Sequence, residues 1–118
     1  MTAGPTIAQH LSADRLDTAL AEAAAALKAR PQDTGLRMLL AELCVLGGDL
    51  ERAETQAKIA QRAASDEAVG IGLFRQYLRG LHARAAWWRD GALPDFPGDP
   101  TACDREAIAL NVALRAGE

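Results

Sequence analysis

The chain has 118 residues and a mass of 12.5 kDa, so we expect one domain, residues 1–118, with no room for a separate cofactor-binding fold. Its formal net charge of −3 and pI near 5.4 argue against a general nucleic-acid-binding protein, which needs clustered Lys and Arg. About half of the residues are apolar but only 4% are aromatic, and long alanine-rich stretches favour thin, closely packed helices. The composition therefore predicts an all-α fold.

One pattern occurs twice in the first part of the chain. Residues 14–19 correspond to residues 48–53, so that the leucines at 16 and 50 and the alanines at 19 and 53 coincide. A period of about 34 residues is typical of tetratricopeptide-like helical hairpins, which stack because one hairpin cannot bury its apolar stripe alone. We predict two hairpin units over residues 7–64, the first one truncated, in a right-handed α-α superhelix.

The first unit begins with a short helix from Ile7 to Leu11, and a second helix starts at Leu16 and ends before Pro31, whose ring stops it. Asp33 or Thr34 can cap a third helix, which is almost wholly apolar and therefore belongs at the centre of its bundle. Gly47-Gly48 ends that helix.

A fourth helix follows over residues 50–64, and a long amphipathic helix is predicted over residues 66–89. Its expected apolar face consists of Val69, Leu73, Phe74, Tyr77, Leu78, Leu81, Ala85 and Trp88. Residues 90–99 form a Pro/Gly-rich loop. Asp99 at the N-cap and Pro100 at the first helical position then open a C-terminal helix over residues 100–116.

Stacked hairpins curve and leave a concave side that can bind a peptide. With the helices aligned on the 34-residue period, we expect six side chains to point toward this concave side: Met38, Glu42, Val45, Leu46, Gln76 and Arg79. Glu42 is nearly the only charge between Met38 and Gly48, and a carboxylate there is either a polar anchor for a ligand or one half of an internal ion pair with an arginine such as Arg15 or Arg75.

A second surface is expected on the long helix, where the interface candidates are Trp87, Trp88, Arg75 and His82. The adjacent tryptophans point about 100° apart, so one of them is either exposed or covered by the following loop. The basic residues along the other side are either a solvated face or a docking strip for an acidic segment.

Catalytic and metal-binding patterns do not emerge from the sequence. It contains no GxSxG, glycine-rich phosphate loop or HExxH motif, and its two cysteines have no metal-ligand spacing. We therefore expect no enzymatic activity, no metal and no cofactor, with Cys44 as a core residue. Residues 1–9 carry no secretory signal and no apolar run is long enough for a membrane span, so we expect a cytoplasmic protein.

Four segments, residues 13–20, 28–31, 37–43 and 48–53, resemble tetratricopeptide repeats. Together with the segments 77–81, 88–94 and 97–100, they resemble more specifically the N-terminal region of the ImpE/SciE/TagJ accessory proteins of bacterial type VI secretion. Members of that family usually carry a further C-terminal domain, which this sequence does not include.

This resemblance implies a non-enzymatic adaptor that binds other components of the secretion apparatus. The implied partner is a helical segment of the small sheath subunit, and the implied role is in sheath handling by the AAA+ recycling ATPase. Two alternatives are a structural homo-oligomerisation module, with a second copy of the chain as the partner, and a tetratricopeptide-type chaperone or adaptor outside secretion.

Overall fold

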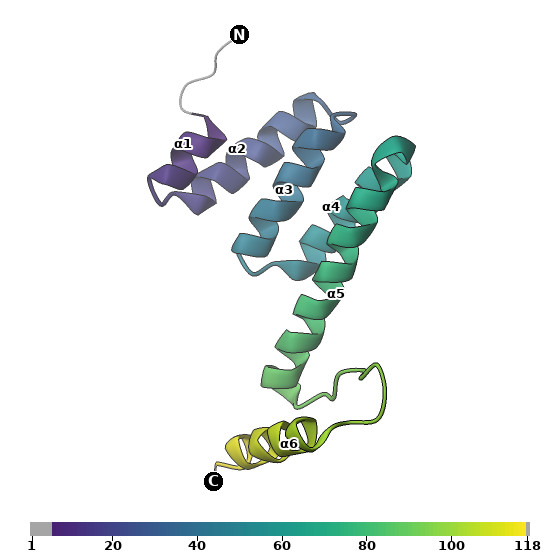
Figure 1. The fold of residues 1–118 in the computed structure, drawn as a ribbon. Coiled ribbons are helices and arrows are strands. Elements are labelled where there is room, and N and C mark those ends of the chain that lie inside the picture. Colours follow the sequence, from purple (N-terminus) through teal and green to yellow (C-terminus); the bar gives the residue numbers. More distant parts are fainter. Residues whose placement is uncertain (1–5, 118) are drawn as a thin grey trace. The chain divides into compact units, whose positions relative to one another are not determined.

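The computed structural model describes residues 6–117 and is shown in Figure 1. Over that range the chain forms helices, turns and loops without a β-strand, which confirms the all-α prediction. The elements are α1 (Ile7–Ser12), α2 (Leu16–Ala29), α3 (Thr34–Leu46), α4 (Leu50–Ala63), a 3-10 turn η1 (Ser65–Glu67), α5 (Ala68–Asp90) and α6 (Ala102–Arg115). Residues 1–5 and 118 of the predicted domain lie outside the described residues.

Side-chain caps fix most helix starts. The Asp33 carboxylate accepts a hydrogen bond from the Leu36 N–H at 3.0 Å, so of the two predicted caps for α3 the structure has Asp33, and Thr34 is the first residue of the helix. The Asp49 carboxylate does the same for α4 by accepting from the Arg52 N–H at 3.1 Å. These caps satisfy backbone donors that have no partner within their own helix, so the hairpin boundaries follow from local chemistry.

The C-terminal helix starts later than predicted. Thr101 is its N-cap, because the Thr101 hydroxyl accepts from the Asp104 N–H at 3.1 Å while the Asp104 carboxylate accepts from the Thr101 N–H at 2.8 Å. This reciprocal capping box satisfies two donors at once, so Asp99 and Pro100 precede α6. The predicted start of the long helix is also too early, since residues 65–67 form the 3-10 turn η1.

The chain divides into two compact units, Met1–Leu78 and Arg79–Glu118, and α5 contributes to both. In the first unit, α1 packs on α2, α2 on α3, and α3 on α4. Successive helices run in opposite directions (Figure 1). The central position predicted for α3 is confirmed, because α3 contacts both α2 and α4.

Alanines at the helix contacts let these helices approach closely. Six of them are completely buried: Ala19, Ala23, Ala41, Ala53, Ala57 and Ala60. Leu40 and Leu43 of α3 fill the space between them and are almost fully buried. Each large buried aliphatic side chain stabilises the fold by about 1.5–3 kcal/mol, so α3 supplies much of the core of this unit.

The contact between α4 and α5 combines apolar and charged groups. Ile71 packs with Ala57 and Ala60 of α4, and Met38 and Phe74 pack against this cluster. Beside it, the Arg75 guanidinium forms an ion pair with the Glu54 carboxylate at 2.6 Å. Arg75 also donates to Gln61 Oε1 at 2.7 Å. A charged group thus belongs to the buried side of α5.

The predicted apolar face of α5 is therefore partly wrong. Ile71 and Leu78 form its buried side, whereas Val69, Leu73 and Tyr77 are exposed. Hydrophobic periodicity alone predicts a face that includes the exposed residues, and it does not anticipate that Arg75 turns inward towards Glu54. We call Val69, Leu73 and Tyr77 the α5 apolar stripe.

In the second unit, α6 is tied to the end of α5 by polar contacts. The Asn111 side chain is buried and donates to the Trp87 carbonyl at 3.2 Å. The Arg115 guanidinium donates to the Arg89 carbonyl at 2.7 Å. Both acceptors belong to the last turn of α5. The Trp87 carbonyl also accepts from the Gly91 N–H at 3.1 Å, whereas the Arg89 carbonyl lies too close to the end of the helix for such a bond, so these contacts attach α6 to the end of α5.

Candidate functional site

The predicted peptide-binding residues of α3 occupy different environments. Met38 is half-buried and packs against the cluster on α4 and α5, and Val45 is also half-buried. Glu42 and Leu46 are exposed. A spacing of four residues places Met38, Glu42 and Leu46 along one side of α3, so this side runs from the edge of the core into solvent.

The internal ion pair considered for Glu42 is not formed. Arg75 pairs with Glu54 instead, and Arg15 is exposed. An exposed carboxylate needs no buried counter-ion because water solvates it, so Glu42 is a surface residue of α3.

The α5 apolar stripe consists of large apolar side chains that are exposed to solvent. Val69, Leu73 and Tyr77 are 81%, 62% and 65% exposed and follow one another at intervals of four residues. Leu43, which occupies the position equivalent to Tyr77 one repeat period earlier, is only 1% exposed. The two positions differ in exposure because α3 is packed between α2 and α4. In contrast, α4 contacts one side of α5, and the stripe lies on another side of that helix.

Gln76 and Arg79, the two predicted binding residues on α5, are both exposed. Gln76 belongs to the first unit, lies on the same side of α5 as the stripe, and follows Glu42 by one repeat period. Arg79 is the first residue of the second unit. Gln76 therefore belongs with the stripe. Arg79 belongs to a different unit from the α3 residues.

The interface candidates also separate. Arg75 is held between α4 and α5 by Glu54 and Gln61, so it is not part of a continuous exposed basic strip. His82 and Trp87 are half-buried, and Trp88 is exposed. The two indole rings meet edge to face, with centroids 6.5 Å apart and planes at 84°. The exposed tryptophan of the pair is thus Trp88.

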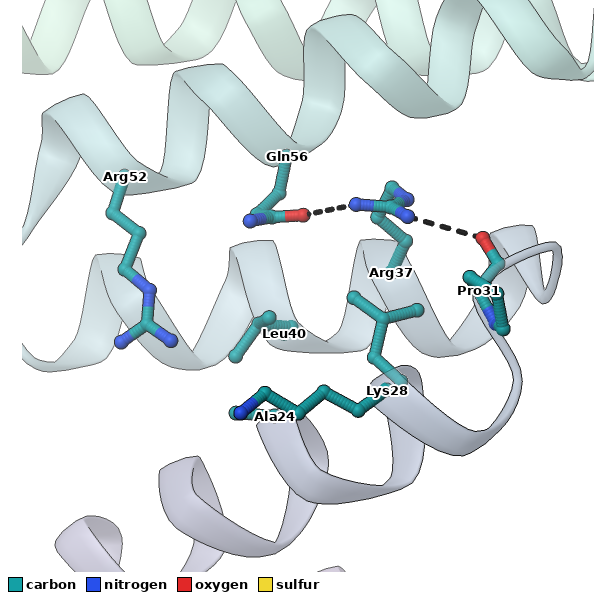
Figure 2. Close-up of a pocket in the computed structure, with 8 residues that line it drawn as sticks. Ala24, Lys28, Pro31, Arg37, Leu40, Arg52 and Gln56 are labelled. Carbon is teal, nitrogen blue, oxygen red and sulfur yellow. Dashed lines mark hydrogen bonds between the residues drawn. The ribbon is translucent and has the colours of Figure 1, made fainter.

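A cleft of about 330 Å³ lies between α2, α3 and α4, within the first unit (Figure 2). Lys28 of α2, Leu40 of α3 and Arg52 of α4 are among the residues that line it. Arg37 of α3 donates to Gln56 Oε1 at 2.7 Å and to the Pro31 carbonyl at 3.0 Å. Three cationic side chains thus line one cleft.

Sequence reasoning missed this cleft. Its basic residues come from three helices, follow no common spacing, and each looks like an ordinary solvated charge on its own helix. Only the packing of α2 and α4 against α3 brings them together.

Residues 6–117 contain no group of three or more His, Cys, Asp or Glu side chains placed to hold a metal ion. Cys44 is buried, and this burial raises the pKa of its thiol while nearby Arg52 lowers it. None of the described helices combines the length and the apolar character that a membrane crossing requires. Comparison of the sequence with known protein-family models and with curated proteins gives no match.

Proposed function

We propose that this protein is a non-enzymatic adaptor whose first unit binds a helical segment of another protein. In this proposal α1 to α4 are two tetratricopeptide-like hairpins of a right-handed superhelix, and the ligand lies along α3 and α5. The observation that carries the proposal is the α5 apolar stripe, three large side chains that remain in solvent on a helix whose other side is packed. A contiguous apolar surface of this kind is typical of a protein interaction site.

The size of the stripe is compatible with an adaptor. Fully burying a large apolar side chain contributes roughly 1.5–3 kcal/mol, so three side chains that are 62–81% exposed could contribute on the order of 5 kcal/mol. Leu46 and Val45 on α3 would add to this contribution. After the costs of association and ordering, we expect micromolar affinity, with Glu42 and Gln76 orienting the ligand through polar contacts.

The partner follows from the family resemblance. A member of the ImpE/SciE/TagJ family would act in the cytoplasm and bind a helical segment of the small sheath subunit of type VI secretion. A helix with apolar residues on one side fits a surface that presents side chains at intervals of four residues. The proposal therefore names the N-terminal helical segment of that sheath subunit as the ligand.

Homo-oligomerisation is the second candidate function. Leu110, Val112 and Leu114 of α6 and Trp88 of α5 are exposed in the second unit, and a second copy of the chain could cover them. Light scattering over a range of concentrations separates the two functions, because a tight dimer at all concentrations supports the second and a monomer supports the first.

The adaptor function is tested by titrating the full chain into a fluorescently labelled peptide of the sheath segment. We expect micromolar binding that Leu73→Asp, Leu46→Asp and Glu42→Lys each weaken at least tenfold. The matched control is Ile59→Asp, since Ile59 is also an exposed aliphatic residue but lies on α4, away from its buried side. Equal affinities for Leu73→Asp and Ile59→Asp would remove α5 from the binding site.

A further inference from the structure

We propose that the cleft between α2, α3 and α4 is a second binding site, which accepts an acidic segment of a partner protein. The cleft lies on a different side of α3 from the residues discussed above. At about 100° per residue, Arg37 and Leu40 point roughly 120–180° away from Glu42 and Leu46 around the helix axis. The two sites are therefore separate, and this proposal does not depend on the adaptor function.

The charges in the cleft select an anion. Lys28, Arg37 and Arg52 line it, and none of its lining residues is Asp or Glu. Neither Lys28 nor Arg52 forms an ion pair with another residue of the described chain. Since the whole protein has a formal net charge of −3, this cleft is a local positive region on an otherwise acidic molecule, and an anionic ligand is attracted to it.

The hydrogen-bonding groups in the cleft select an acceptor. Arg37 donates to two acceptors there, Gln56 Oε1 and the Pro31 carbonyl. The Gln56 amide also carries an NH2 group, which is a donor. Lys and Arg side chains carry donors only. Every polar side chain that lines the cleft thus offers donors to a ligand, and a carboxylate provides the matching acceptors.

The apolar walls favour a peptide over a simple anion. Leu27 and Leu40 are buried and form part of the lining together with Ala24. A volume of about 330 Å³ is at the lower end of the range for ligand pockets, which suits one or two side chains. A glutamate with its methylene stem, beside an apolar neighbour, matches both the donors and the walls, whereas inorganic phosphate makes no use of the apolar surface.

The test measures binding of a rhodamine-labelled peptide of Glu-Leu repeats to the full chain by fluorescence anisotropy. Lys28→Gln/Arg52→Gln removes two cleft cations, and Lys58→Gln/Arg62→Gln removes two exposed cations of α4 outside the cleft. We expect the first double variant to weaken binding about tenfold and the second less than twofold, and we expect binding to weaken with added NaCl. Circular dichroism verifies that both variants keep their helix content.

Several outcomes would overturn the proposal. They are an absence of binding by the unmodified protein, equal weakening by the two double variants, and undiminished binding of a peptide with Gln in place of Glu. Inorganic phosphate that competes as strongly as the peptide would show a simple anion site instead of a peptide site. Leu73→Asp should leave this affinity unchanged, which distinguishes the cleft from the proposed adaptor surface.

Discussion

Leu43 and Tyr77 occupy equivalent positions one repeat period apart, yet one is 1% and the other 65% exposed. Leu43→Ala would remove a side chain from the core between α2, α3 and α4, and such a change costs about 2–5 kcal/mol of unfolding free energy because of lost burial and the cavity left behind. Tyr77→Ala would remove a side chain that is mostly in water. We expect it to change the unfolding free energy by less than about 0.5 kcal/mol.

The difference is large relative to the total stability. A protein of this size has an unfolding free energy of roughly 5–15 kcal/mol. At about 4 °C per kcal/mol, Leu43→Ala should lower the midpoint of thermal unfolding by about 8–20 °C and Tyr77→Ala by at most about 2 °C. The assay is thermal and urea unfolding of the full chain, followed by far-ultraviolet circular dichroism. Equal destabilisation by the two substitutions would refute the assignment of Tyr77 to an exposed stripe.

Four further predictions concern other parts of the chain. Arg75→Met should cost about 1–3 kcal/mol because it leaves the Glu54 carboxylate without its ion-pair partner, and a double-mutant cycle with Glu54→Gln should show coupling in urea unfolding. Thr101→Ala should cost about 1 kcal/mol and fray the start of α6, seen as faster amide exchange there. At neutral pH a thiol-reactive dye should modify exposed Cys103 rapidly and buried Cys44 only on opening. Burial raises the pKa of Cys44, so the folded state favours the neutral thiol. The contribution of the neutral Cys44 thiol to the unfolding free energy is therefore complete below the ordinary thiol pKa of 9.0 and declines as the pH rises above that value. Cys44→Ala should make the unfolding free energy less dependent on pH in this range.

The helices could be predicted from the sequence because local signals mark their ends. Pro31 and the pair Gly47-Gly48 separate α2, α3 and α4, and Asp33 caps α3 as expected. The unusually apolar composition of α3 also indicates its central place. These signals act within a few residues, so no tertiary information is needed to interpret them.

The orientation of α5 and the cleft could not be predicted in this way. Arg75 turns towards α4 because Glu54 and Gln61 lie there to pair with it, and a hydrophobic pattern treats every arginine as a solvent-facing residue. Likewise Lys28 and Arg52 are on different helices, and only the packed structure places both beside Leu40. Long-range contacts therefore decide which exposed residues form a site.

Photo-cross-linking tests the central claim most directly, because it identifies what lies on the α5 apolar stripe. The full chain with p-benzoylphenylalanine in place of Tyr77 is irradiated with the sheath peptide, and protein carrying the same group in place of Ile59 is the control. We expect a cross-link to the peptide from position 77 and none from position 59. Equal cross-linking from both positions, or cross-linking from position 77 to a second copy of this chain only, would contradict the adaptor function.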